Sequence, residues 1–210
     1  MSRPWVRFAL AVAVVTGLFV VARFLSNLAW RSWPGALAET GGASFYVPWG
    51  IAIGIARWRA PRWRPPWRSP PGTWRAASSY VALAVALGGI GWLYRGFLAQ
   101  AMADGLAWPP MTLGMVSGVV LGPFVEEWVF RGLLWRALVP EDPATPATAL
   151  VAIFATAVVF ACWHLPFSPD APLLAHGIFG ALMALVRWRT GSLLAGFVLH
   201  GAANALYFVM

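Results

Sequence analysis

The sequence predicts an all-α protein, a polytopic transmembrane helical bundle of about six to seven spans with a polar site between its late helices. Of its 210 residues, 60% are hydrophobic and only 10% are charged, and the mean hydropathy is +0.70. These values lie outside the range of soluble globular domains. The apolar residues also fall into runs of about 20, the length that a helix needs to cross a bilayer.

The chain is basic, but the distribution of its charge fits a membrane protein. The formal net charge is +8, and all fifteen basic residues are arginine. They gather at the ends of apolar runs, where the positive-inside rule and anionic lipid headgroups account for them. We therefore expect membrane lipid as a partner, no nucleic acid, a location in the plasma (inner) membrane and a cytoplasmic N-terminus.

The first part of the chain, residues 1–98, contains three apolar runs and one arginine-rich loop. The loop at 57–75 interleaves arginine with tryptophan and proline, which prevents a regular helix and suits contact with headgroups on the cytoplasmic side. Pro48 interrupts the second run. The spans predicted for this part are residues 8–22 (extendable to 29), 43–56 and 77–93.

The second part, residues 99–210, contains four further apolar runs separated by short turns. The spans predicted there are residues 111–139, 147–164, 173–186 and 191–210. A bend is expected in the first of these at Gly122-Pro123, because proline removes one backbone hydrogen bond. The carbonyl that Pro123 frees one turn earlier is a place where water or substrate could be held.

Three ionisable residues, Glu126, Glu127 and Arg131, lie together in the apolar run at 111–139. One charge at the centre of a lone spanning helix costs about 2.5 to 3.5 kcal/mol on insertion scales, so three together require partners or a function. Glu127 and Arg131 are four residues apart in the favourable acid-before-base order and are predicted to pair. Glu126 points about 100° away from its neighbour and has no partner on its own helix. We interpret Glu126 as the reactive group, which must meet polar residues of other helices; the alternative is that all three only pack helices together.

Two later spans each carry a histidine with a companion four residues away on the same helix face. Phe160 can pack beneath His164, and His200 shares its face with Asn204. Together with Glu126 they form a set that can activate water. A carboxylate in apolar surroundings is a better proton acceptor than in water, while imidazole and amide groups can orient the water or stabilise an oxyanion.

Other candidates are given structural roles. His176 is interpreted as a helix-end histidine outside the site, and Cys162 as a small buried hydrophobic residue. No His-Glu-x-x-His motif is present, and the aspartates lie in loops. Ser117-Gly118 follows Met115-Val116, whereas the serine motif of rhomboid-type proteases has a glycine two residues before the serine. A zinc-binding helix, a serine nucleophile and an aspartyl dyad are therefore not supported.

The ordered motifs Glu126-Glu127-x-x-x-Arg131, Phe160-x-x-x-His164 and His200-x-x-x-Asn204 together resemble the CPBP family. This family comprises CAAX-type prenyl endopeptidases and bacteriocin-processing membrane proteases, and it is also called the Abi family. The resemblance covers about residues 111–206 and implies that 99–210 is the core of an intramembrane glutamic endopeptidase. It implies catalytic roles for Glu126, His164, His200 and Asn204, and supporting roles for Glu127, Arg131 and Phe160.

In this interpretation Glu126 is the general base for water, His164 is its partner, and His200 and Asn204 lie on the oxyanion side. The substrate is a membrane-associated protein or peptide, which could be prenylated, and no cofactor is required. The family has also been described as metalloproteases, and in that alternative Glu126, His164 and His200 would bind zinc. A non-catalytic immunity or scaffold protein, or a proton-coupled transporter, would use the same buried cluster, although the sequence shows no inverted halves.

Overall fold

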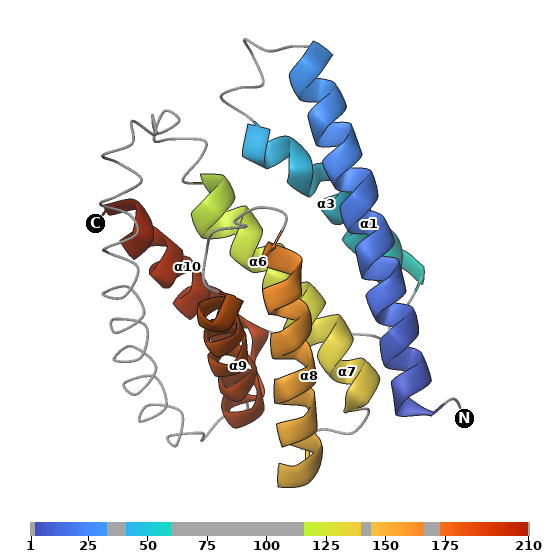
Figure 1. Ribbon diagram of the computed structural model, residues 1–210, viewed down its shortest axis with the longest axis vertical. Helices are drawn as coiled ribbons and strands as arrows, with labels where there is room; N and C mark the ends of the chain where they lie inside the picture. The colour runs from blue at the N-terminus through green and yellow to red at the C-terminus, as the bar shows by residue number, and fades with distance from the viewer. Residues whose placement is uncertain (1–2, 33–40, 60–115, 140–143, 166–172, 210) are drawn as a thin grey trace.

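The computed structural model shows a bundle of helices (Figure 1) and describes residues 3–32, 41–59, 116–139, 144–165 and 173–209. Every element in these ranges is a helix, so the predicted all-α bundle is confirmed. The separate helices are α1 (Pro4–Ser32), α3 (Gly41–Arg59), α8 (Pro146–His164), α9 (Leu173–Thr190) and α10 (Leu193–Val209). One further continuous helix has four segments: η1 (Val116–Leu121), α6 (Gly122–Glu126), η2 (Glu127–Leu134) and α7 (Trp135–Leu138), where η marks a π-helix.

These helices correspond to six of the seven predicted spans. The exception, residues 77–93, lies outside the described residues, as does most of the loop at 57–75. The expected interruption at Pro48 is wrong, because α3 continues through this proline and ends at Arg59, within the predicted loop. Proline is tolerated inside membrane-spanning helices where neighbouring groups satisfy the backbone carbonyl that it frees.

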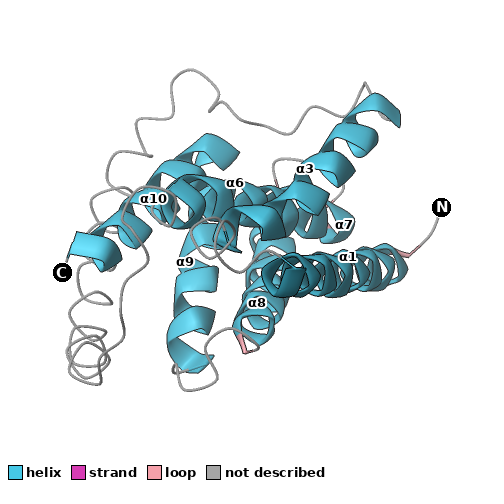
Figure 2. Ribbon diagram, turned by 90° about the horizontal axis from the view of Figure 1, so that it is seen from above, coloured by secondary structure: helices cyan, strands magenta, loops and turns pink. Residues whose placement is uncertain are grey.

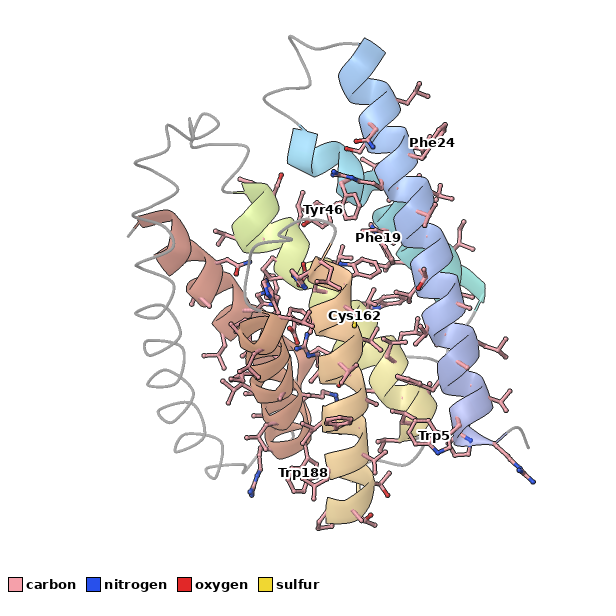
Figure 3. The ribbon with its side chains drawn as sticks, in the orientation of Figure 1. Trp5, Phe19, Phe24, Tyr46, Cys162 and Trp188 are labelled. Carbon is pink, nitrogen blue, oxygen red and sulfur yellow. The ribbon has the colours of Figure 1, made fainter. Side chains whose placement is uncertain are left out.

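The outer surface of the bundle is strongly apolar. Two described helices, Pro4–Leu28 and Pro146–His164, are long and apolar enough to cross a membrane by length and composition, and Phe45–Ile55 and Leu193–Ala205 are shorter apolar helices. Phe24 on α1 is 65% exposed and points away from the bundle (Figure 3). Cys162, which we expected to be buried, is exposed on α8. In a membrane protein the outward face is as hydrophobic as the core, so composition alone does not separate the two.

The four-segment helix lies at the centre of the bundle (Figures 1 and 2). α1 and α3 pack side by side against one side of it, the α8–α9 pair lies against another, and α10 contacts its first three segments. A shared core of aromatic and aliphatic side chains joins these helices, including Trp49 of α3, Phe130 of η2 and Phe160 of α8. The helix that carries both glutamates is thus surrounded by all the other described helices.

α8 and α9 are in close contact at Gly180. A Cβ atom added there would lie 3.1 Å from Cδ1 of Phe160 and 3.2 Å from the backbone Cα of Ala157. Small residues at such crossings let two helix backbones come together in a membrane.

We expect Gly180→Ala to lower the stability of the bundle by about 1 to 3 kcal/mol, because the added methyl group would overpack against a backbone atom that cannot move aside. The measurement is the thermal unfolding midpoint of the purified protein in detergent. Gly17→Ala in α1 is the matched control, because a Cβ there has nothing within 4 Å. Equal midpoints for the two variants would contradict this account of the α8–α9 contact.

Candidate active site

Glu127 is buried inside the apolar bundle and makes its polar contacts through one carboxylate oxygen, Oε1. Its side chain is 1% exposed, and its Oε1 atom lies 3.1 Å from Nη1 of Arg131. The predicted ion pair is therefore confirmed. The same Oε1 atom also accepts a hydrogen bond from Nδ1 of His200, at 3.0 Å, which the sequence did not predict. Glu127 thus forms an ion pair with an arginine of its own helix and a hydrogen bond with a histidine of α10.

Arg131 extends this network to two more helices. Its Nη2 atom donates a hydrogen bond of 2.8 Å to the Gly180 carbonyl oxygen of α9, and its guanidinium lies 4.7 Å from the centre of the Phe160 ring of α8. A buried ion pair is tolerable only where further hydrogen bonds satisfy its charged groups. Contacts from α8, α9 and α10 supply part of what is needed, while Oε2 of Glu127 and Nε of Arg131 are buried and form no hydrogen bond with any described residue.

Glu126 is in a different environment from its neighbour. Its Oε2 atom is buried and accepts no hydrogen bond from any residue that the structure describes. This atom lies 3.8 Å from Nε2 of His164 and 3.6 Å from Nε2 of His200. The expectation that Glu126 has no partner on its own helix and meets polar residues of other helices agrees with this geometry. The site therefore unites α6, α8 and α10.

The position of His164 follows from the length of α8. His164 is the last residue of this helix, and the end of α8 reaches only the level of α6 in the middle of the bundle (Figure 1). Phe160 lies one turn earlier, and its ring packs against the imidazole with the centroids 4.4 Å apart, as its spacing predicted. Nδ1 of His164 also bonds the Phe160 carbonyl oxygen at 2.8 Å. This one residue therefore fixes both the plane and the rotation of the His164 ring.

The hydrogen-bond partners assign the same tautomer to both histidines. A carbonyl oxygen and an arginine-paired carboxylate can only accept, so the Nδ1 atoms of His164 and His200 carry the hydrogens. In the neutral rings Nε2 then presents a lone pair. Both Nε2 atoms face Oε2 of Glu126, so three acceptor atoms surround one position. A water molecule at such a position can donate its two hydrogens to two of these three acceptors at a time.

His176 lies closer to the site than its interpretation as an outside residue implied. It is in the first turn of α9, as expected of a helix-end histidine, but its ring stacks on that of His164 with the centroids 4.5 Å apart and 25° between the planes. Spacing along one helix could not show this contact, because it depends on how far α9 is shifted along α8.

Asn204 binds a backbone carbonyl oxygen near Pro123, where we expected water or substrate to be held. Its Nδ2 atom donates a hydrogen bond of 2.8 Å to the carbonyl oxygen of Gly118 in η1. In a π-helix each N–H bonds the carbonyl five residues earlier, and Pro123, five residues after Gly118, has no N–H to give. One N–H of Asn204 supplies this missing bond. Its predicted oxyanion role therefore depends on the second N–H of the amide.

Two glycines let α10 come this close to the central helix. A Cβ on Gly196 would lie 2.5 Å from Oε2 of Glu127, and a Cβ on Gly201 would lie 2.7 Å from the Val119 carbonyl oxygen. Gly196 precedes His200 by one turn, so the glycine that admits the carboxylate and the histidine that binds it share one face of α10. The spacing Gly196-x-x-x-His200-x-x-x-Asn204 was the available sequence signal for this contact.

We expect the two glutamates to differ in their effect on stability. Glu127→Ala would leave the Arg131 guanidinium buried without its carboxylate, a loss of about 3 to 5 kcal/mol for a broken buried pair. Glu126→Ala removes a buried acid whose Oε2 accepts no hydrogen bond from the described residues, so it should change stability little. Membrane abundance and the unfolding midpoint in detergent measure the difference. Comparable losses in the two variants would show that Glu126 also holds the helices together.

The segment that contains this site matches the model of a known protein family. Residues 107–206 match the model of a family described as type II CAAX prenyl endopeptidase, Rce1-like. No curated protein and no solved structure matches the chain. The matched segment includes both glutamates, His164, His200 and Asn204. Residues 107–206, a little under half of the chain, therefore resemble the Rce1-like family of type II CAAX prenyl endopeptidases, and this resemblance together with the two long apolar helices supports an integral membrane protein.

Proposed function

We propose that this protein is an intramembrane endopeptidase in which Glu126 activates a water molecule for attack on a peptide bond. The observation that carries the proposal is the Oε2 atom of Glu126, which is buried, accepts no hydrogen bond from the described residues and faces the Nε2 atoms of His164 and His200. A buried polar atom without a partner calls for a functional explanation. The family name supports a substrate at a membrane-associated CAAX sequence, prenylated or not.

The first step of the proposed reaction is proton transfer from water to Glu126. The distances of 3.6 and 3.8 Å to the two imidazoles exceed the range of a direct hydrogen bond. A water about 2.8 Å from Oε2 and from one Nε2 would bridge the two groups. Glu126 takes one of its protons while the oxygen forms a bond to the peptide carbonyl carbon, and the carbonyl becomes an oxyanion.

The second step is collapse of this tetrahedral intermediate. The carbonyl re-forms as the bond between carbon and nitrogen breaks, and Glu126 returns its proton to the leaving amine. The products are a carboxyl group and an amine, and no residue of the protein becomes acylated. His200 keeps its orientation through Glu127, and His164 keeps its own through Phe160, so neither imidazole has to reorganise during the reaction.

In the metal-dependent alternative, the same residues would bind a metal ion. Metal-bound histidines also donate their second ring N–H to a carboxylate or carbonyl, as His164 and His200 do here. However, no group of three or more His, Cys, Asp or Glu in the described ranges is arranged to hold a metal ion. We propose the reaction without a metal, and zinc remains the alternative for Glu126, His164 and His200.

The proposed function also includes the location of the site in the membrane. We infer a plasma (inner) membrane location with the N-terminus on the cytoplasmic side, from the concentration of arginine at the ends of the predicted inner segments. Membrane lipid is the permanent partner, and the peptide reaches Glu126 from the bilayer or its interface. The predicted division into residues 1–98 and 99–210 places the catalytic residues in the second part.

We expect Glu126→Gln, His164→Ala and His200→Ala to lower the rate of cleavage by at least on the order of 100-fold, because a positioned general base contributes about that much or more. Comparative proteomics of membranes with wild-type protein and the Glu126→Gln variant would measure cleavage and identify the substrate. Thr156→Val is the control, because its hydroxyl bonds only carbonyls of its own helix.

Two outcomes of this experiment would contradict the proposal in different ways. If Glu126→Gln leaves the peptide pattern unchanged while the cellular phenotype persists, the protein is a non-catalytic immunity or scaffold protein. If a chelator removes a stoichiometric metal and with it the activity, and zinc restores it, the metal-dependent version is correct.

A further inference from the structure

Helix α3, which belongs to the first part of the chain, brings a phenol to the central helix at the level of the site. The side chain of Tyr46 is partly buried and lies between α3 and the helix that carries the glutamates (Figure 3). A Cβ atom on Gly122 would lie only 2.9 Å from the Tyr46 hydroxyl. The hydroxyl therefore rests directly on the backbone at Gly122, where any larger residue would displace it.

Gly122 places this hydroxyl on the catalytic face of the helix. It precedes Glu126 by four residues, and residues four apart lie on the same face. Within the part of the chain that the structure describes, no hydrogen bond commits the hydroxyl to another group. Its proton is thus free to bind a ligand next to Glu126.

The site otherwise has many acceptors and few donors. Glu126 and the two Nε2 atoms all present lone pairs to the water position. Arg131 forms an ion pair with Glu127 through Nη1 and donates a hydrogen bond from Nη2 to Gly180, and one N–H of Asn204 donates to Gly118. Hydrolysis of a peptide needs donors aimed at the carbonyl oxygen, where negative charge develops. The hydroxyl of Tyr46 can supply such a hydrogen-bond donor.

We propose that the Tyr46 hydroxyl binds the carbonyl oxygen of the scissile peptide bond and stabilises the oxyanion, together with the second N–H of Asn204. Asn204 is anchored at Gly118, and Tyr46 lies against Gly122, four residues later on the same helix. Two donors share one oxygen when each lies about 3 Å from it, and the proposal requires these two side chains to converge in that way. This role rests on the proposed endopeptidase function and makes α3 a part of the catalytic site.

We expect Tyr46→Phe to lower kcat on the order of 100-fold, the usual effect of removing one oxyanion donor, with KM and the unfolding midpoint little changed. The ring remains, so its packing is preserved. The assay uses an internally quenched farnesylated CAAX peptide, or, if wild type does not cleave it, a peptide spanning the cleavage site found by membrane proteomics. Thr156→Val, which removes another hydroxyl from the bundle, is the matched control and should retain full kcat.

A second pair of variants separates catalysis from packing. Gly122→Ala should displace the phenol and lower both stability and kcat, because the new methyl group would contact the hydroxyl and also the Ser117 carbonyl oxygen, at 3.2 Å. Adding Tyr46→Phe to Gly122→Ala removes the atom that the methyl group meets. The double variant should regain part of the unfolding midpoint but none of the kcat.

The outcomes distinguish this inference from the function on which it rests. If Glu126→Gln is inactive while Tyr46→Phe retains wild-type kcat, the endopeptidase function stands and the role of Tyr46 is wrong. If Tyr46→Phe raises KM or lowers the unfolding midpoint without lowering kcat, Tyr46 only packs or binds substrate, and the oxyanion role is again wrong. If Glu126→Gln is as active as wild type, the proposed function itself fails.

Discussion

The Glu127–Arg131 ion pair is the interaction on which the rest of the site depends. Both side chains are 1% exposed in an apolar bundle, so neither charge could be there without the other. Arg131 also donates a hydrogen bond to the Gly180 carbonyl of α9, Oε1 of Glu127 also accepts one from His200 of α10, and Phe160 of α8 covers the guanidinium. The contacts of two buried charges therefore connect three helices to the central one. The same contacts orient the His200 imidazole toward Glu126.

The two adjacent glutamates show how one helix can serve structure and chemistry together. Because neighbouring side chains on a helix point about 100° apart, Glu127 enters the ion-pair network while Glu126 enters the space between α8 and α10. π-helical segments lie on both sides of this point, at Val116–Leu121 and Glu127–Leu134, and such segments often occur at functional sites. In η1 the wide turn leaves the Gly118 carbonyl for Asn204, which ties α10 to the central helix at a second point.

The spacing of residues within a helix predicted much of this structure, but it could not predict the contacts between helices. The pairing of Glu127 with Arg131 and the packing of Phe160 against His164 each follow from a separation of four residues, and the apolar runs located six described helices. The stacking of His176 on His164 and the bond from Asn204 to Gly118 depend on how far one helix is shifted along another, which periodicity does not determine. The exposure of Cys162 was missed for a related reason, since lipid-facing and core positions are equally hydrophobic.

The packing also shows why the first part of the chain matters to a site whose motifs all lie in the second. Val15 of α1 and Trp49 of α3 belong to the same hydrophobic cluster as Val129 and Phe160. The residues that match the family model begin at 107, yet the core around the glutamates is completed by side chains from before residue 60. A division at residue 98 therefore separates the sequence motifs from the rest of the chain, but the apolar environment that strengthens every electrostatic contact of Glu126 is built by both parts.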